Sequence, residues 1–378
     1  MSTLHVPTHP VRLVTASSLF DGHDASINIM RRIFQSQGCE VIHLGHNRSV
    51  QEVVDAALEE DVQGVAVSSY QGGHVEYFEY LVELLRAAGA GHVRVVGGGG
   101  GVIVHDEITR LRESGVTIFS PEDGQRLGLP GMVNTVVADC DTDLWDLRPV
   151  SVDQVLAGER SAVARAITGA ELGRLDDDMR TQLRAAAERS HAPVLGLTGT
   201  GGSGKSSLTD EILRRFRTDQ QDKLRVAVVA VDPTRRKGGG ALLGDRIRMQ
   251  DHAADEGVFI RSMASRGHLG GLSFTTPQAV RVLDAAGFDV VLVETVGVGQ
   301  SEVEVAGLAD TTMVLLAPGM GDGIQAAKAG ILEVGDLYVV NKADRDGADR
   351  LRRDLRSGLA LTERAADAWQ PPILATVA

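Results

Sequence analysis

The sequence predicts an α/β protein with two parallel-sheet domains that are joined by a helical segment. Two observations support this prediction. In the first half of the chain, short runs rich in β-branched residues alternate with amphipathic stretches, which is the pattern of βαβ units. In the second half, a glycine-rich turn separates a strand-like run from a helix-like run. The length of 378 residues is enough for two or three domains.

The composition is that of a soluble globular protein. Hydrophobic residues make up 43% of the chain and charged residues 24%. A net charge of −13 with only 4% aromatic residues disfavours nucleic-acid binding, which needs basic faces and stacking platforms. Cys39 and Cys140 cannot form a disulfide framework and fit a reducing compartment. Because Met1–Arg12 has no apolar core and no apolar run approaches ~18 residues, we expect a cytoplasmic protein without a membrane partner.

Five predicted strands alternate with five predicted helices in the first half of the chain. The strands are Val11–Ala16, Glu40–Leu44, Gly64–Ser68, Val93–Val96 and Val116–Phe119. The helices are Ala25–Gln37, Val50–Glu59, Val75–Ala88, Ile103–Ser114 and Asp123–Ala138. Right-handed crossovers would place these helices on both faces of one parallel sheet. Ligands bind at the carboxyl ends of such strands, where polar or glycine-rich turns fall at Ser18–Ser26, Ser68–His74 and Gly97–Gly101.

The first of these turns contains the sequence Asp21-Gly22-His23-Asp24. A histidine two residues after an aspartate can donate one ring N–H to that carboxylate. Its other nitrogen then keeps a fixed lone pair, as in metal-ligating histidines. Taken alone, the motif favours a plainer alternative, a surface loop in which Asp21 caps the next helix.

The spacing of three elements changes this interpretation, because it resembles the cobalamin-binding module of cobalamin-dependent mutases and methionine synthase. Asp21-x-His23-x-x-Ser26 is followed by Ser68 and then by Gly97-Gly98. The resemblance implies a flavodoxin-like Rossmann fold. It also implies that His23 replaces the cofactor's own dimethylbenzimidazole as the lower axial ligand of cobalt, with Asp21 polarising the histidine.

The same resemblance implies a slot for the displaced nucleotide tail of the cofactor. Ser68, Gly97 and Gly98 would line this slot, where a side chain in place of a glycine would fill the space. Ser26 stands where the family pattern has glycine, and its small side chain can still lie near the corrin. Tyr70 stands where the pattern has leucine, so the packing of the tail is left open.

The segment from Asp139 to Ala192 contains no strand-like run. It is predicted to be helical, with helices over Ser151–Thr168 and Asp176–Ser190. Arginines are scattered through it, at Arg160, Arg165, Arg174, Arg180, Arg184 and Arg189. We favour a solvated helical linker that packs against one domain. The alternative is that these arginines join the two domains or contact a partner.

The glycine-rich turn of the second half satisfies the phosphate-loop pattern. The strand-like run Val194–Thr198 leads into Gly199-Thr200-Gly201-Gly202-Ser203-Gly204-Lys205-Ser206, and a helix is predicted over Ser207–Phe216. The glycines let successive backbone N–H groups turn inward around phosphates, and the helix N-terminus adds a partial positive charge. Lys205 would reach the β and γ oxygens, and the Ser206 hydroxyl would bind Mg²⁺.

A second motif selects the base of the nucleotide. Asn341-Lys342-Ala343-Asp344 follows the predicted strand Leu337–Val340. The Asp344 carboxylate can accept hydrogen bonds from guanine N1–H and the exocyclic amine, and adenine offers no such pair of donors. Asn341 would brace the loop, and the stem of Lys342 would cover the base. The predicted nucleotide is GTP.

Two further strand-like runs end in acids. Val226–Val231 is followed by Asp232, and Val290–Val293 is followed by Glu294. Each acid alone could be a helix cap or a loop residue. Because both stand at strand ends on the phosphate side, we expect them near Mg²⁺.

The sequence Glu294-Thr295-Val296-Gly297 resembles the switch II pattern of GTPases, with glutamate in place of aspartate. The backbone N–H of Gly297 would contact the γ-phosphate. Thr295 joins Ser206, Asp232 and Glu294 in the expected Mg²⁺ site. We expect Lys205, Glu294 and Gly297 to carry GTP hydrolysis.

Longer strings resemble the GTPase chaperones that load adenosylcobalamin into acyl-CoA mutases. They are Glu294 to Glu302, Gly244-Asp245-Arg246-Ile247-Arg248-Met249, and Ser265-Arg266-Gly267. The resemblance implies that Asp245 belongs to the metal site and that Arg248 contacts the nucleotide. Gln300 could orient the attacking water, but its role is left open.

The order of the two halves resembles fused isobutyryl-CoA mutase. The resemblance implies a cobalamin-binding domain over residues 1–142, a helical linker over 143–191 and a P-loop GTPase domain over 192–378. It further implies adenosylcobalamin, GTP and Mg²⁺ as cofactors, and a homodimer for the full-length form. In that family a C-terminal barrel binds acyl-CoA, isobutyryl-CoA and butyryl-CoA interconvert by radical chemistry, and the GTPase gates cofactor loading. These 378 residues leave no room for that barrel.

Three functional hypotheses follow from the sequence. The chain could be the N-terminal portion of a fused mutase. The stop at Ala378, where a further base loop and a closing helix are expected, favours this hypothesis. It could instead be a two-domain carrier that serves a separate mutase subunit, or a cobalamin-sensing GTPase. A further alternative is that the first domain is a degenerate flavodoxin-like fold that binds nothing.

Overall fold

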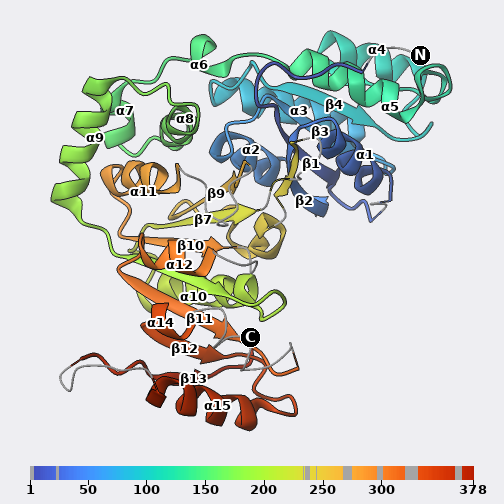
Figure 1. Ribbon diagram of the computed structural model, residues 1–378. Helices are drawn as coiled ribbons and strands as arrows, with labels where there is room; N and C mark the ends of the chain where they lie inside the picture. Colours follow the sequence, from blue (N-terminus) through green and yellow to red (C-terminus); the bar gives the residue numbers. More distant parts are fainter. Residues whose placement is uncertain are drawn as a thin grey trace. The chain divides into compact units, whose positions relative to one another are not determined.

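The structure, a computed structural model, consists of two compact units (Figure 1). It describes residues 4–22, 25–232, 234, 239–243, 245–266, 275–295, 301–319, 331–361 and 368–378. The first unit comprises Met1–Gln154, Glu159–Arg174 and Thr234–Asp255. The second unit comprises Val155–Gly158, Leu175–Pro233 and Glu256–Ala378.

The first unit is built on a parallel sheet with the strand order β5-β4-β3-β1-β2-β8. Its strands are β1 (Arg12–Ser18), β2 (Glu40–Arg48), β3 (Gly64–Ser68), β4 (Arg94–Gly98), β5 (Val116–Ile118) and β8 (Ala241–Leu243). Its main helices are α1 (Ala25–Ser36), α2 (Val50–Glu59), α3 (His74–Ala87), α4 (His105–Glu113) and α5 (Pro121–Cys140). The predicted alternation of strands and helices is confirmed, with ends that differ by a few residues.

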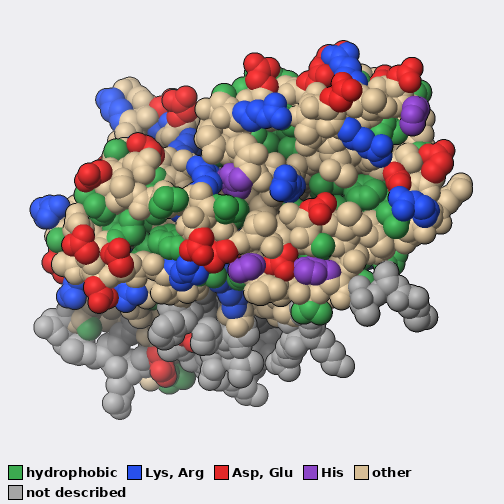
Figure 2. Space-filling view, turned by 90° about the horizontal axis from the view of Figure 1, so that it is seen from above, with side chains coloured by type: hydrophobic (Ala, Val, Ile, Leu, Met, Phe, Trp, Pro, Cys, Tyr) green, Lys and Arg blue, Asp and Glu red, His purple; other side chains and the backbone are tan. Residues whose placement is uncertain are grey.

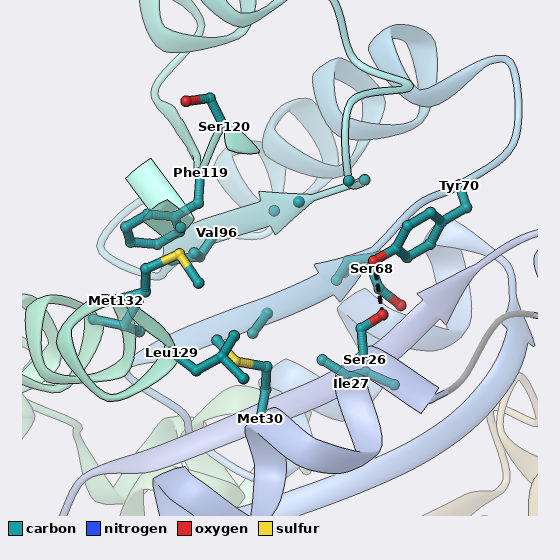
Figure 3. Close-up of a pocket in the computed structure, with 18 of the residues that line it drawn as sticks. Ser26, Ile27, Met30, Ser68, Tyr70, Val96, Phe119, Ser120, Leu129 and Met132 are labelled. Atoms are coloured by element: carbon teal, nitrogen blue, oxygen red, sulfur yellow. Dashed lines mark hydrogen bonds between the residues drawn. The ribbon is translucent and has the colours of Figure 1, made fainter. Parts of the chain in front are cut away.

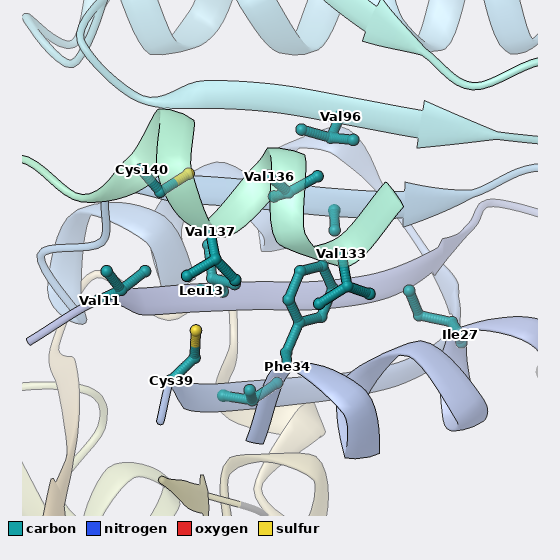
Figure 4. Packing of buried hydrophobic residues seen from close by; sticks show 12 residues of the cluster. Val11, Leu13, Ile27, Phe34, Cys39, Val96, Val133, Val136, Val137 and Cys140 are labelled. Atoms are coloured by element: carbon teal, nitrogen blue, oxygen red, sulfur yellow. The ribbon is translucent and has the colours of Figure 1, made fainter. Parts of the chain in front are cut away.

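Helices cover both faces of this sheet, as the crossover rule requires (Figure 1). Helices α1 and α5 bury one apolar face against β1 and β2, where Phe34 and Val137 lie in the same cluster as Leu13 (Figure 4). Cys39 and Cys140 belong to this cluster, and burial raises the pKa of the Cys140 thiol to about 12. Neither thiol is therefore suited to nucleophilic or redox chemistry.

Polar caps begin the helices that lie around the sheet. Ser49 accepts a hydrogen bond from the backbone N–H of Glu52, whose side chain returns the interaction, at the start of α2. Ser120 caps α5 in the same way. Gly128, with φ of 64°, interrupts α5 and lets its second half turn back onto the core.

The predicted helical segment contains no strand, in line with the sequence. It forms α6 (Leu144–Leu147), α7 (Val152–Leu156), α8 (Arg160–Glu171) and α9 (Asp177–Ser190). Helix α8 belongs to the first unit and α9 to the second. Its arginines do not all lie on a solvated face, because Arg165 is buried and pairs with Asp61. The predicted domain boundaries stay a prediction.

The second unit is a parallel sheet with the strand order β13-β12-β11-β6-β10-β7-β9. Its strands are β6 (Val194–Gly199), β7 (Val226–Asp232), β9 (Val258–Ala264), β10 (Val290–Thr295), β11 (Thr311–Leu316), β12 (Leu337–Val340) and β13 (Ile373–Ala375). Its helices are α10 (Lys205–Asp219), α11 (Thr276–Ala285), α12 (Ser301–Ala306), α14 (Ile331–Val334) and α15 (Ala348–Leu361). The predicted strand, loop and helix around the phosphate loop are confirmed.

Two surface properties bear on the expected partners. Among the described helices, none is both long and apolar enough to cross a membrane. On the face shown in Figure 2, lysine and arginine side chains are interspersed with aspartate and glutamate.

Candidate functional sites

A pocket of about 220 Å³ lies at the carboxyl ends of β3 and β4 in the first unit (Figure 3). Apolar side chains from α1 and α5 form part of its wall, among them Ile27, Met30 and Met132. The hydroxyl groups of its lining come from Ser26, Ser68, Tyr70 and Ser120. A mostly apolar cavity with a few placed polar groups is typical of a small-molecule site.

The structure brings four of the predicted cobalamin residues together around this pocket. They are Ser26, Ser68, Gly97 and Gly98. Ser68 ends β3 beside Gly98 at the end of β4, and its hydroxyl lies 2.9 Å from that of Ser17. Their part in binding stays a prediction. His23, the predicted cobalt ligand, lies outside the described residues.

Asp21 is fully buried, although it does not line the pocket. Its carboxylate accepts a hydrogen bond of 2.6 Å from the backbone N–H of Tyr70. Asp21 therefore ties the turn after β1 to the turn after β3, a role that the motif did not reveal. The predicted polarisation of His23 by Asp21 stays a prediction.

Ser26 and Tyr70, the two residues that depart from the family pattern, contact each other. The Ser26 hydroxyl lies 2.7 Å from the Tyr70 phenol oxygen, and both side chains line the pocket (Figure 3). The Tyr70 ring packs against Gly100, where an added Cβ would lie 2.6 Å from the ring. The glycine run thus makes room for the tyrosine.

Gly97 and Gly98 are glycines for different physical reasons. A Cβ at Gly97 would lie 2.3 Å from the Phe78 ring of α3, on the face of the sheet away from α1 and α5. At Gly98 a Cβ would make only an ordinary contact, 3.7 Å from the Phe119 carbonyl. Side chains alternate along a strand, so a side chain at Gly98 would project toward the pocket, whereas Gly97 lines the pocket with its backbone. The predicted part of both glycines in a slot for the nucleotide tail stays a prediction.

The phosphate loop of the second unit requires glycine at its end. Gly204 has φ of 92°, and a Cβ there would lie 2.3 Å from the Asn341 amide nitrogen. Helix α10 begins at the next residue, with no side-chain cap on its N-terminus. The hydroxyl of Ser203 is buried without a hydrogen-bond partner among the described residues. Uncapped N–H groups and an unpaired hydroxyl fit a bound phosphate.

Lys205 is held over this loop. Its ammonium donates to the carbonyl of Gly199 at 2.8 Å and to that of Thr200 at 3.2 Å. The side chain comes from the first turn of α10 and is largely buried. The position is the one expected for a lysine that neutralises phosphate oxygens.

The predicted metal residues Ser206 and Glu294 are in direct contact. The Ser206 hydroxyl donates to one carboxylate oxygen of Glu294 at 2.6 Å. Thr209 donates to the other oxygen at 2.8 Å. Thr209 is not among the residues predicted from the sequence, because no motif marks it. Its position three residues after Ser206, which puts both side chains on the same side of α10, is the feature of the sequence that could have identified it.

Asp232 ends β7 beside β10, which carries Glu294. The two acids thus stand at the carboxyl ends of neighbouring strands, as predicted from the sequence. The Thr295 hydroxyl lies 3.1 Å from that of Thr198 on β6. The binding of Mg²⁺ by these three residues stays a prediction.

The base motif is connected to the phosphate loop by hydrogen bonds. The amide nitrogen of Asn341 donates to the Ser203 carbonyl at 2.9 Å, and Lys342 Nζ donates to the Gly202 carbonyl at 2.7 Å. Ala343 donates its backbone N–H to Thr376. Asp344 is exposed at the end of the motif, which leaves its carboxylate accessible to a base.

Several predicted residues are not placed at the nucleotide site. Gly297 and Gln300 lie outside the described residues, as does the side chain of Asp245. Asp245 and Arg248 lie in the 3-10 helix η1 (Asp245–Arg248), which is part of the first unit. Their predicted roles stay predictions.

Comparisons with known proteins match both halves of the chain. Residues 11–124 match the family model described as B12 binding domain. Residues 163–378 match the model described as Methylmalonyl Co-A mutase-associated GTPase MeaB. Both halves therefore carry the domain types that their motifs predicted.

Relatives of greater length match all or nearly all of this chain. A fused isobutyryl-CoA mutase of Nocardia farcinica is 58% identical over 100% of this chain and 35% of its own length. One from Cupriavidus metallidurans is 55% identical over 92% of this chain and 32% of its own length. The chain thus spans about a third of the length of these relatives. Among solved structures, a LAO/AO transport system kinase is 34% identical over 60% of this chain and 67% of its own, with a TM-score of 0.46.

Proposed function

Because the chain belongs to the family of methylmalonyl-CoA mutase-associated GTPases, preceded by a B12-binding domain as in fused isobutyryl-CoA mutases, we propose that it is the cofactor-handling portion of an acyl-CoA mutase. In this proposal the first unit binds adenosylcobalamin. The second unit hydrolyses GTP and acts as a chaperone for cofactor loading. The proposed substrate pair is isobutyryl-CoA and butyryl-CoA, of which the names of the relatives contain the first.

One observation carries the proposal: a single chain holds both an apolar slot at a strand-end crevice and a phosphate loop that is connected to a guanine motif. The slot fits the cofactor's nucleotide tail, because a flat base needs apolar walls and a sugar needs hydroxyl partners such as Ser68. His23 would hold the cobalt. When bound, adenosylcobalamin supplies the radical that starts the rearrangement.

The residues of the second unit would act on GTP directly. Lys205 neutralises charge on the β and γ oxygens, and Ser206 and Glu294 hold Mg²⁺. Asp344 selects guanine, while Asn341 holds its loop against the phosphate loop. Asp232, Thr295 and the backbone of Gly297 complete the proposed site.

The remaining parts of the proposal concern the whole protein. An acyl-CoA-binding domain follows in the same chain or is supplied by a separate subunit, since the relatives are about three times as long. The full-length form is a homodimer. The cytoplasm is the proposed compartment, which fits two buried thiols with no disulfide.

Spectroscopy tests the first unit. Cobalamin added to the chain should bind with its own base displaced and a histidine in its place, which changes the absorption spectrum. His23→Ala should abolish the histidine-ligated spectrum, whereas His46→Ala, at an exposed position of β2 in the same unit, should keep it. Matching spectra for wild type and His23→Ala would show that the ligand is assigned wrongly.

Steady-state hydrolysis tests the second unit. The wild-type chain should release phosphate from GTP, and Lys205→Ala should remove this activity. If both proteins hydrolyse GTP at the same rate, the proposed GTPase site is not the source of the activity.

A further inference from the structure

The pocket of the first unit has two chemically different ends (Figure 3). Three hydroxyl groups lie at one end, and they belong to Ser26, Ser68 and Tyr70. Apolar side chains form the other end, and they belong to Met30, Phe119, Leu129 and Met132. We call these four residues the apolar end. Every residue that lines the pocket belongs to the first unit.

The side chains of the apolar end offer no strong hydrogen bond to a ligand. A methionine thioether is at best a weak acceptor. The hydroxyl of Ser120, which also lines the pocket, is used in capping α5, because it accepts the backbone N–H of Asp123 and donates to the Asp123 carboxylate, both at 3.2 Å. The carbonyl of Gly97 accepts the backbone N–H of Phe119 at 3.0 Å. A polar ligand atom at this end would therefore have no side-chain partner.

The pocket extends into the hydrophobic core of the first unit. Phe34 and Val136 line it, and both are at most 2% exposed. They belong to the buried cluster that α1 and α5 form with the sheet (Figure 4). A ligand group that enters such a place loses its hydration. This loss favours apolar groups and penalises polar groups that stay unpaired.

The order of groups along the nucleotide tail decides which of them takes the apolar end. The phosphate and the sugar carry oxygens that suit hydroxyl partners, whereas the base is flat and largely apolar. The hydroxyl end is also the end that is tied to the turn after β1, because Asp21 accepts the backbone N–H of Tyr70 at 2.6 Å. The sugar therefore fits beside Ser26, Ser68 and Tyr70, and the base fits at the apolar end.

We infer that Met30 and Met132 select the base of the nucleotide tail, accepting the dimethylbenzimidazole of cobalamin and disfavouring adenine in its place. The inference rests on the proposed binding of cobalamin by the first unit. The outer edge of dimethylbenzimidazole carries two methyl groups, which gain from burial, and its ring packs well against thioethers. Adenine carries ring nitrogens and an amine instead, and these would lose water without gaining a partner.

The test measures binding to the full 378-residue chain and needs no enzyme activity. Absorption titrations give the dissociation constants for cobalamin and for a cobamide that has adenine as its base. We define the base ratio as the constant for the adenine cobamide divided by that for cobalamin. Free cobamides differ in how strongly their own base holds cobalt, but this property of the ligand is the same for every variant. A change in the base ratio on substitution therefore reports the contact with the protein.

Glutamine at either methionine position should relax the selection. Met132→Gln should lower the base ratio by about five- to tenfold, because glutamine has nearly the size of methionine and gives adenine a hydrogen-bond partner. Met30→Gln, on α1, should act in the same direction. If Met132→Gln fails to fold, as shown by circular dichroism, Leu129→Gln serves in its place, since Leu129 belongs to the apolar end and is 43% exposed.

Two controls separate polarity from general damage to the pocket. Met132→Leu keeps an apolar side chain of similar volume, so it should leave the base ratio unchanged. Tyr70→Phe alters the hydroxyl end. It should weaken the binding of both cobamides by the same factor and also leave the base ratio unchanged.

Three results would overturn the inference. One is a set of folded glutamine variants that all keep the wild-type base ratio. Another is a Met132→Leu variant whose base ratio falls as much as that of Met132→Gln, since shape and not polarity would then decide. In both cases the wild type still binds cobalamin, so the proposed function stands. The third result, a wild type that binds neither cobamide, removes the proposed function of the first unit and the inference together.

Discussion

The Ser26 hydroxyl and the Tyr70 phenol oxygen lie 2.7 Å apart in the wall of the pocket (Figure 3). These are the two positions at which the sequence departs from the cobalamin-module pattern, glycine in one case and leucine in the other. The departures are linked, because the serine provides the hydrogen-bond partner that a tyrosine needs when its ring is packed against Gly100.

Removal of this hydrogen bond should weaken binding of the nucleotide tail. Tyr70→Phe keeps the ring but loses the bond, which is worth about 0.5–1.5 kcal/mol. We expect cobalamin to bind roughly two- to tenfold more weakly to this variant. Cobinamide, which lacks the nucleotide tail, should bind both proteins equally. Equal loss of affinity for the two ligands would mean that Tyr70 acts on the corrin and not on the tail.

The two glycines of β4 should respond differently to the same substitution. Gly97→Ala forces a methyl group toward the Phe78 ring and should lower the free energy of unfolding by about 1–3 kcal/mol. Gly98→Ala has room for its methyl group, so stability should stay near that of the wild type, whereas cobalamin binding should weaken. Urea denaturation and cobalamin titration of both variants check this. A Gly98→Ala variant that binds cobalamin normally would contradict the assignment of Gly98 to the slot.

Thr209 should affect the affinity for Mg²⁺, although it is not expected to bind the ion itself. Its hydroxyl donates to the Glu294 oxygen that Ser206 does not hold. Loss of such an orienting partner typically costs ten- to a hundredfold in metal affinity. We therefore expect Thr209→Val to raise the Mg²⁺ concentration for half-maximal GTP hydrolysis by about tenfold.

Thr181→Val is a suitable control for Thr209→Val. Both hydroxyl oxygens lie within hydrogen-bonding distance of the carbonyl four residues earlier in their helix, that of Lys205 for Thr209 and that of Asp177 for Thr181. Thr181 is exposed on α9 and lies away from Glu294 in the sequence. A similar Mg²⁺ response in the two variants would assign the effect to the helix and not to the carboxylate.

Base selection should follow the side chain of Asp344. Asp344→Asn replaces an acceptor by a group that also donates, and so it should disfavour guanine and favour xanthine, which presents a carbonyl at the corresponding position. We expect GTP hydrolysis at low substrate concentration to fall by at least about a hundredfold and xanthosine triphosphate to become the better substrate. An unchanged preference for GTP would remove the guanine assignment. Asp346→Asn, on the same exposed loop, is the matched control.

Much of both units could be predicted from local sequence signals. The predicted strand Gly64–Ser68 and helix Val50–Glu59 have the bounds that the structure shows. Their β-branched or amphipathic patterns and the Ser49 cap act locally. The phosphate loop and the base motif were equally accessible, because glycine conformation and residue order define them.

The parts that could not be predicted depend on contacts between distant segments. Strand β8 has only three residues, and nothing in its own sequence says that it pairs with β2. Thr209 became visible only once Glu294 on β10 had been placed beside α10. Glycine is needed at position 97 because of the ring of Phe78, a residue of α3 that comes earlier in the chain. In each case a partner far away in sequence determines the role.

The contacts of the N-terminal segment with Asp141 predict how the stability of the fold depends on acidic pH. Asp141, after the end of α5, accepts backbone N–H groups from Thr8 and His9 at 2.8 Å each, and its carboxylate also contacts the rings of His5 and His9. Burial works against ionisation of this carboxyl group, but these hydrogen bonds prevail and hold its pKa at about 2, below the usual 3.8. The folded state therefore favours the ionised form.

Because the pKa of Asp141 is lower in the folded state than in the unfolded state, its ionised carboxylate stabilises the fold. The effect is greatest at pH values where the group is ionised in both states. The contribution of Asp141, about 2 kcal/mol, should be fully present above pH ~4 and should be lost as the pH falls toward ~2. Asp141→Asn removes the charge at every pH. Urea denaturation should show a large difference in unfolding midpoint between wild type and Asp141→Asn at pH ~5, and this difference should shrink steadily down to pH ~2.5. A difference that stays constant over this range would mean that Asp141 acts through shape and hydrogen bonding alone, without its charge.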